Sequence, residues 1–526
     1  MKICAKIQEP VNSNIYLFGS LILIVILVAA LPGISLAGSD VKDSMVKIYC
    51  VENQPDYDNP WNMKGPQASS GSGCVIDGNR ILTNAHVVSD QTFVQVRLHG
   101  RSKKYPARVL AVSHEADLAL LAVNEPAFFR GAKPLAFGRL PQVEQEVVVY
   151  GFPEGGDMLS TTKGVISRIE HHRYVHSQIQ LLAMQLDAAV NAGNSGGPVM
   201  VDGSVVGIVM QSLKGAENIG YTVPVPVIWH FLTDVDDGRY DGFPDDGIFI
   251  QSLENEGLKK MYGLKDNQSG ALVTSITPGS PAENKIFPGD VLLAVDGHPI
   301  ADDGTVEFRP RERTSCNFYV QQHQVGEKVA FSILRQGQKA SVDFTQDRAW
   351  GTGRLVPLMK YDVRPTYYVY GGLVFCPLTL NYILTWGDDW AKDAPYNLLA
   401  FLADGRLTRK GEEAVIIIKA LPSGVNNGYE DYINKRIVEV NGKKIKNLQD
   451  LIRTVEDNSE TPYVVFKTAA STTIALDRKK AEAEQAEILK TYQIAADRSA
   501  NLKTAVSKDG EESRKVADLV SPDSDI

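Results

Sequence analysis

The 526-residue sequence lacks the features that define several common classes of protein. Its five cysteines include no pair at CxxC spacing, which excludes a dense disulfide scaffold and a cysteine-rich zinc site. It contains no HExxH segment, no phosphate-binding glycine loop and no carboxylate cluster at metal spacing. The net charge is −9 without a long basic block, which argues against nucleic-acid binding through phosphates. We therefore expect no cofactor, no metal and no nucleic-acid partner.

Long apolar runs are also scarce. One run covers residues 15–31, follows Lys2 and Lys6, and precedes the small-x-small segment Ser35-Leu36-Ala37. This order favours a cleaved signal peptide over residues 1–37. An uncleaved membrane anchor stays open, because the run approaches the length that spans a bilayer. Both alternatives export the rest of the chain to the periplasm or another extracytoplasmic compartment.

Most of the cysteines fall in segments that we expect to be structured. Cys50 and Cys74 lie on two expected successive strands and would pair in an oxidising compartment only if their Cβ atoms were close. Cys316 and Cys376 look like small buried apolar residues. Whether Cys50 and Cys74 form a disulfide stays open at this point.

Short strands separated by turns dominate the region from about residue 45 to residue 223. This pattern, with few helices, predicts a mainly β sandwich or barrel. Apolar residues at helical spacing predict one helix over 226–235. The polar, turn-rich segment 236–242 then marks a domain boundary, so we assign residues 38–240 to a first domain.

Two further modules carry a repeated element. Residues 290–297 and 435–442 each form an expected strand that ends in an Asp-Gly or Asn-Gly turn, the signature of a tight hairpin. We assign the modules to residues 243–348 and 355–477. The last segment, 478–526, is expected to hold a helix over 479–502 and a disordered tail.

Three segments carry residues of the type that catalysis requires. TNAHVV surrounds His86, ADLALL surrounds Asp117, and NAGNSGGP surrounds Ser195. His, Asp, Ser is one of the chain orders in which a catalytic triad is built. A serine hydroxyl needs an adjacent base, a histidine accepts its proton near neutral pH, and an aspartate holds the imidazole in one tautomer. Asp187 is a weaker candidate that we interpret as a strand-end acceptor, and the other histidines as surface or packing residues.

The glycines around Ser195 indicate how the negative charge of the reaction would be held. In the segment Gly193-Asn194-Ser195, the backbone can curl so that the amides of Gly193 and Ser195 point at one spot. A tetrahedral oxyanion would be stabilised there. We therefore predict an oxyanion hole over residues 193–195.

These three motifs resemble the HtrA/Deg family of serine proteases, and the resemblance covers nearly the whole expected mature chain. It is closest to plant-type Deg proteases and their bacterial relatives, on the segments around residues 70–73, 211–221 and 303–309. The resemblance implies a mainly β chain, with a chymotrypsin-like double β-barrel followed by two PDZ-like domains. It also implies ATP-independent degradation of unfolded or damaged proteins in homo-oligomers built from trimers. A sensor loop over 168–180 and a cleft border over 213–218 are implied by position.

The resemblance also implies where polypeptide binds. Ala189 would form the base of the pocket for the residue before the cut and Ile219 would line it, which favours small or medium aliphatic side chains over Lys or Arg. PDZ domains take an extended peptide as an added strand and hold its carboxylate on backbone amides. The segments expected to do so are Gly247-Ile248-Phe249 in the first module and Gly372-Leu373-Val374 in the second.

Two features argue against peptide binding by these modules. Asp245 and Asp246 would repel a carboxylate, and residues 379–409 form an unusually long insertion. A role in oligomer contacts therefore stays open.

A second hypothesis belongs to a different class, a PDZ-based peptide-binding chaperone in which Ser195 is dispensable. The complete set of triad motifs favours the protease.

Overall fold

The computed structural model describes residues 41–154, 156–212, 219–457 and 460–503. The expected signal segment, the 213–218 cleft border and the end of the chain lie outside these residues. No helix within the described ranges is long and apolar enough to cross a membrane.

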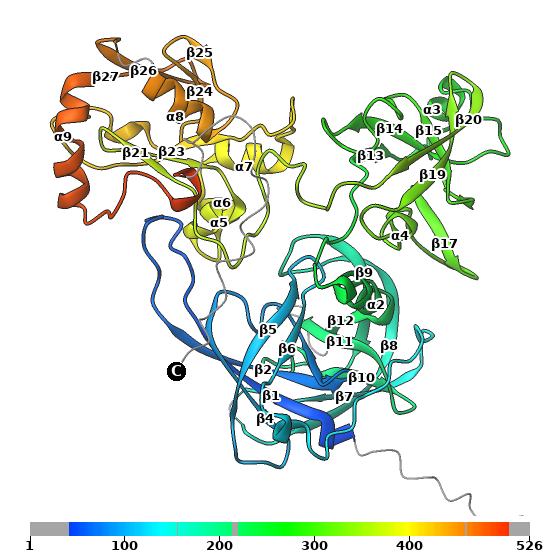
Figure 1. Ribbon diagram of the computed structural model, residues 1–526. Coiled ribbons are helices and arrows are strands. Elements are labelled where there is room, and N and C mark those ends of the chain that lie inside the picture. The colour runs from blue at the N-terminus through cyan, green and yellow to red at the C-terminus, as the bar shows by residue number, and fades with distance from the viewer. Residues whose placement is uncertain (1–40, 155, 213–218, 458–459, 504–526) are drawn as a thin grey trace, which may run out of the picture.

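Two closed six-stranded antiparallel barrels form the first domain (Figure 1). The first barrel has the strand order β1-β2-β3-β6-β5-β4 and contains β1 (Met45–Glu52), β2 (Gln67–Ile76), β3 (Arg80–Thr83), β4 (Gln91–Leu98), β5 (Tyr105–Ser113) and β6 (Leu118–Ala122). The second has the order β10-β11-β12-β9-β8-β7 and contains β7 (Glu146–Gly151), β8 (Ser160–Arg173), β9 (Gln180–Asp187), β10 (Pro198–Val201), β11 (Ser204–Ser212) and β12 (Ile219–Pro224). The prediction of a mainly β, double-barrel domain is confirmed.

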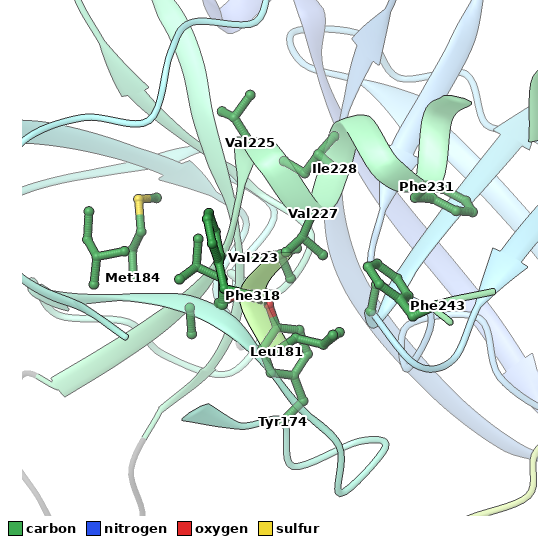
Figure 2. Close-up of a cluster of buried hydrophobic side chains, with 14 of the residues drawn as sticks. Tyr174, Leu181, Met184, Val223, Val225, Val227, Ile228, Phe231, Phe243 and Phe318 are labelled. Atoms are coloured by element: carbon green, nitrogen blue, oxygen red, sulfur yellow. Dashed lines mark hydrogen bonds between the residues drawn. The ribbon is translucent and has the colours of Figure 1, made fainter. Parts of the chain in front are cut away.

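Helix α2 (Val225–Asp234) follows the second barrel directly and begins at a proline-rich segment, where the missing proline N–H costs no helical hydrogen bond. Its apolar face joins a core that continues from the second barrel into the first PDZ-like module. Figure 2 shows Phe231 of α2, Phe243 of the following segment and Phe318 of the module in this cluster. The first module therefore shares its core with the protease domain.

The first module is one antiparallel sheet with a small hairpin. It contains β13 (Ile248–Gln251), α3 (Glu256–Met261), β14 (Ala271–Ile276), β15 (Val291–Val295), β16 (His298–Pro299), β17 (Thr305–Arg309), β18 (Glu312–Ser315), α4 (Asn317–Val320), β19 (Lys328–Arg335) and β20 (Gln338–Thr345). The sheet order is β13-β14-β15-β19-β20, which puts β13 at its edge.

The second module is built from two sheets and several helices. The sheets are β21-β22-β23 and β25-β24-β26-β27, from β21 (Tyr368–Tyr370), β22 (Leu373–Pro377), β23 (Val415–Ala420), β24 (Ile437–Val440), β25 (Lys443–Lys444), β26 (Tyr463–Thr468) and β27 (Thr473–Asp477). The helices are α5 (Leu380–Ile383), α6 (Trp390–Asp393), α7 (Tyr396–Asp404), α8 (Leu448–Asp457) and α9 (Arg478–Thr491). The fully buried members of its two clusters all come from this module and the linker before it, and Trp61 of the β1–β2 loop packs against one of them. The long insertion thus forms the short helices α5–α7, which pack on its core.

One expectation about local structure is wrong, and the open question of a Cys50–Cys74 disulfide is answered. The helix expected over 479–502 ends at Thr491, because Gln493 has a φ of 55° and the chain turns back to bury Ile494. Cys50 and Cys74 are free, since Cys50 lies opposite Ser69 and Cys74 opposite Met45, well apart along the paired strands.

The loop between β1 and β2 reaches from the first barrel to the second module (Figure 1). Lys419 Nζ lies 2.9 Å from Asp58 Oδ2, and the rings of Trp61 and Tyr367 meet edge to face at 5.9 Å. The second module is therefore attached to the barrel opposite the one that carries the first module.

Candidate active site

His86 and Asp117 lie in turns of the first barrel that follow β3 and precede β6. The Nδ1 atom of His86 is 2.7 Å from Asp117 Oδ2, and the His86 amide donates to Asp117 Oδ1 at 2.9 Å. Asn84 Nδ2 donates to the Asp117 carbonyl at 2.7 Å. Asp117 has a φ of 54°, a left-handed conformation that aspartate tolerates better than most residues. Both carboxylate oxygens are thus directed at His86.

Burial and charge shift the pKa values of His86 and Asp117 in opposite directions. Burial alone would lower the pKa of His86, but the Asp117 carboxylate raises it overall. Burial alone would raise the pKa of Asp117, but His86 and the hydrogen bonds it donates lower it overall. The Asp117 side chain is only 3% exposed, whereas that of His86 is 33% exposed. The imidazole therefore has an ionised partner on one side and access to solvent on the other.

Ser195 lies in the turn between β9 and β10, and Ser72 of the first barrel ties this turn in place. The Ser72 amide donates to the Ser195 carbonyl at 2.8 Å, and Ser72 Oγ donates to the Gly193 carbonyl at 2.7 Å. Thr83 Oγ1, just before the His86 turn, donates to the Ser72 carbonyl at 2.7 Å. These buried bonds join the segment of His86 to the segment of Ser195 across the two barrels.

The peptide between Ala192 and Gly193 is oriented by a backbone bond. The Ala192 carbonyl accepts from the Glu154 amide at 2.8 Å, so the Gly193 N–H of the same trans peptide points the opposite way. Gly193 has a φ of 89°, and a Cβ there would lie 2.5 Å from the Phe152 carbonyl oxygen, so only glycine fits. Neither the Gly193 nor the Ser195 amide donates to an acceptor in the described part of the chain.

The backbone amide of Asn194, unlike those of Gly193 and Ser195, is hydrogen-bonded within the turn. This amide donates to the Asn191 carbonyl at 3.0 Å, and the side chain is buried beside Gly151. Of the three residues expected at the oxyanion hole, Asn194 therefore has its amide occupied within the turn.

The expected pocket residues lie at the edge of the second barrel. Ala189 is exposed and Ile219 half-buried, and Asp187 lies exposed at the end of β9 opposite Ile219. The pattern missed Val190, whose Cγ2 lies 2.6 Å from where a Gly220 Cβ would stand. Val190 and Gly220 are therefore in close contact beside Ile219.

The two expected peptide segments differ in accessibility. In the first module, β13 pairs only with β14 among the described strands, and Phe249 and Ile250 are exposed. The amides of Gly247 and Ile248 donate to the carboxylates of Asp245 and Asp246, at 3.0 Å and 2.9 Å.

In the second module, β22 pairs with β21 on one side and β23 on the other, and Leu373 and Val374 are fully buried. The Gly371 amide donates to Gln485 of α9 at 3.0 Å, and a Cβ on Gly372 would meet Asn426 at 2.3 Å. The strand position that a PDZ ligand takes on β22 is therefore filled by β21.

The sequence predicts surface or packing roles for His114 and His176, and both rings do pack, each stacked on that of Tyr361, but their place beside His86 was not predicted. His176 is buried with its ring centroid 6.1 Å from that of His86, and it bonds to His114. No local pattern could have identified them, because they come from two different turns.

Comparison with known proteins agrees with this architecture. Residues 71–208 match the trypsin-like peptidase domain, and residues 257–345 and 356–501 each match a PDZ domain. The chain is 39% identical over 415 residues to protease Do-like 4, mitochondrial, from Arabidopsis thaliana, covering 79% of this chain and 77% of that protein. It is 37% identical over 470 residues to protease Do-like 2, chloroplastic, from the same plant, covering 88% and 75%. The chain belongs to the Do-like (HtrA/DegP) family of serine proteases.

As a member of this family, the protein is a serine endopeptidase with PDZ domains. Among solved structures it is similar to an HtrA-type protease, AlgW, bound to a decapeptide, with a TM-score of 0.44 and 21% identity over 59% of this chain and 98% of that one.

Proposed function

We propose that this endopeptidase cleaves unfolded or damaged polypeptides without ATP, with Ser195 as nucleophile, His86 as general base and Asp117 as the group that orients His86. The main support is the His86–Asp117 pair at 2.7 Å, joined through Thr83 and Ser72 to the turn that carries Ser195. Such a connection keeps base and nucleophile in a constant relation, which efficient proton transfer requires.

The proposed reaction uses groups of this chain only. Ser195 Oγ attacks the carbonyl carbon of the scissile peptide while its proton passes to His86 Nε2. The carbonyl oxygen becomes an oxyanion held by the amides of Gly193 and Ser195. When the tetrahedral intermediate collapses, the C–N bond breaks and the leaving amine takes the proton from His86. Water then repeats the sequence on the acyl-enzyme and releases the acid product and Ser195.

The walls formed by Val190 and Gly220, with Ala189 and Ile219 nearby, favour small or medium aliphatic side chains before the cut. Ala189 supplies no carboxylate at the expected base of the pocket, so a Lys or Arg side chain would find no charged partner there. Mass spectrometry of casein fragments tests this directly, because cleavage mainly after Lys or Arg would contradict the proposed pocket.

The first test is digestion of casein by the purified protein without nucleotide, beside Ser195→Ala. We expect cleavage by the wild type and none by Ser195→Ala. Asp117→Asn is expected to lower kcat by about four orders of magnitude, as in the general triad template, because the imidazole then adopts the wrong tautomer. Equal cleavage by wild type and Ser195→Ala would reject the proposed nucleophile.

The open edge of β13 favours a second activity, in which the first module holds extended polypeptide. Since the Gly247 and Ile248 amides are occupied by Asp245 and Asp246, we propose that the edge takes an internal stretch rather than a chain-end carboxylate. This would deliver unfolded segments to the cleft. If Ser195→Ala still prevents a denatured client from aggregating, the chaperone activity is separate from cleavage.

Compartment and assembly belong to the same proposal. The residues before 41 favour export to an extracytoplasmic compartment, and the family favours homo-oligomers built from trimers. Fractionation of cells that express the tagged chain tests the first. Light scattering of the purified protein tests the second, and a monomer under all conditions would contradict it.

A further inference from the structure

A cluster of aromatic and titratable side chains lies beside the His86–Asp117 pair and includes residues from the linker between the two PDZ-like modules. Its centre is His176, at the tip of the β8–β9 hairpin. The tip is tied to the turn before Asp117, because Ser177 Oγ donates to the Glu115 carbonyl at 2.9 Å. His176 is only 8% exposed, so it has little contact with water.

A chain of hydrogen bonds runs from His176 to the linker. Asp362 Oδ2 lies 2.8 Å from His114 Nε2, and His114 Nδ1 lies 3.0 Å from His176 Nε2. Because the carboxylate only accepts, His114 donates to it through Nε2, and its Nδ1 shares a hydrogen bond with His176 Nε2. Burial lowers the pKa of His176 to about 3, which agrees with a neutral imidazole in this chain.

Tyr361 covers both imidazoles. Its ring stacks on that of His176 with centroids 3.9 Å apart, and on that of His114 at 4.8 Å. Its hydroxyl donates to the His176 carbonyl at 2.8 Å. Burial, and to a lesser degree the charge of Asp117, raise the pKa of Tyr361, so the phenol lies within electrostatic range of that carboxylate.

Asp362 also binds the turn that follows His86. Its carboxylate accepts from the Asp90 amide at 2.6 Å, and its own amide donates to the Asp90 carboxylate at 2.8 Å. Two adjacent linker residues thus contact the segment after His86, the segment before Asp117 and the hairpin tip. All three segments surround the same pair of side chains.

We propose that Tyr361 and Asp362 are positioning residues, which hold the His86–Asp117 pair in its reactive geometry through His176, His114 and Asp90. This inference rests on the proposed function of that pair. The linker leads directly into β21 of the second module, so undocking of that module would loosen the same contacts. The second module thereby controls turnover without binding substrate at β22.

The test compares Tyr361→Ala, Tyr361→Phe and Asp362→Ala in the full chain, with Tyr396→Ala as a matched control. Tyr396 is 85% exposed and lies at the start of α7 in the second module. Cleavage of a fluorogenic peptide gives kcat and KM. A separate aliquot of each preparation is labelled to completion with a fluorophosphonate, which counts the reactive serines so that kcat refers to competent enzyme only. Ser195→Ala establishes whether turnover depends on Ser195 at all.

For Tyr361→Ala we expect kcat to fall about tenfold or more with KM within about twofold of wild type, because the loss is one of geometry. Tyr361→Phe keeps the stack and should retain kcat within about threefold, and Asp362→Ala should fall between the two. An unchanged kcat in both Tyr361→Ala and Asp362→Ala, a change in KM alone, or a Phe variant as slow as the Ala variant would overturn the inference. If instead the wild type and Ser195→Ala behave alike, the proposed function fails rather than the positioning role.

Discussion

The two PDZ-like modules contain the same strand-and-turn repeat, yet they are attached to the protease domain differently. The first shares a continuous core with the second barrel and contacts the β8–β9 hairpin through Thr314 and Gln321. The second has its own cores and reaches the protease domain through the linker and the β1–β2 loop.

Their sheet edges differ in the same way. β13 is an open edge, whereas β22 is covered by β21. A strand edge is a binding site only while its backbone groups have no partner. The comparison therefore teaches that the same fold element can leave a strand edge open in one module and have it closed by an added strand in the other.

The largest expected effect is a pH-dependent one in the first module. Burial, and then the nearby Asp245, raise the pKa of Asp246 to about 7 from its ordinary 3.8. Because the folded-state pKa is raised, the folded module prefers the protonated form and loses stability as pH rises from about 4 through 7. Asp246→Asn should therefore stabilise the module at pH 8 by up to about 4 kcal/mol, at about 1.4 kcal/mol per pKa unit, and by little at pH 4.

Scanning calorimetry at both pH values measures this difference. The comparison variant is Asp245→Asn, which weakens the 2.7 Å pair with Arg348 but also removes a charge that raises the pKa of Asp246, so at pH 8 it should change stability much less than Asp246→Asn. A stabilisation by Asp246→Asn that is equal at pH 4 and pH 8 would show that the buried charge is not its cause.

Next in size is Gly372→Ala in the second module. Gly372 has a φ of 79°, and a Cβ would lie 2.3 Å from Asn426 Nδ2 and 2.6 Å from the Leu421 carbonyl oxygen. Asn426 Nδ2 already binds the Gly371 and Leu421 carbonyls, so it cannot move without losing them. We expect a loss of about 3 kcal/mol in the unfolding free energy of this module, measured by calorimetry.

Gly428→Ala separates crowding from backbone strain. Gly428 has a φ of 87°, and nothing lies within 4 Å of where a Cβ would stand, so backbone strain alone should lower the unfolding free energy by about 1 kcal/mol. Equal losses in the two variants would mean that the closed edge of β22 is less tightly packed than we infer.

A smaller effect is expected where the first module contacts the hairpin. Thr314 Oγ1 accepts from the His171 amide at 3.1 Å and lies 2.7 Å from His171 Nδ1. Burial lowers the pKa of His171 to about 4, so the ring is neutral and its Nδ1 atom accepts a hydrogen bond from the Thr314 hydroxyl. Thr314→Val should lower the free energy of unfolding by about 2 kcal/mol, because the His171 amide and ring nitrogen both lose their hydrogen-bond partner. The His171 amide should then exchange faster with deuterium. Thr314→Ser keeps the hydroxyl and should behave like wild type.

The smallest effect concerns the chemistry of the bound chain end. If β13 takes internal segments, amidation of a peptide's C-terminus should change its affinity for the Ser195→Ala protein by less than about threefold. Phe249→Ala should weaken binding of both forms, because it removes exposed apolar surface on the edge. Fluorescence anisotropy measures both, and a tenfold preference for the free carboxylate would contradict the self-occupied amides.

The local sequence determined a large part of this protein. The strands of the barrels, helix α2 and the hairpin repeat follow from periodicity and turn residues within short windows. The segments of His86, Asp117 and Ser195 were recognisable because each needs a particular local backbone, such as the glycines that let residues 193–196 curl.

Only the tertiary structure decided how these segments are connected. Ser72 joins the turns of His86 and Ser195, β21 closes β22, and Tyr361 covers His176, and none of these contacts has a periodic signal. The end of α9 at Thr491 and the separation of Cys50 from Cys74 belong to the same class. The physical reason is that each depends on packing between residues far apart in the chain, where burial and partner availability outweigh local preference.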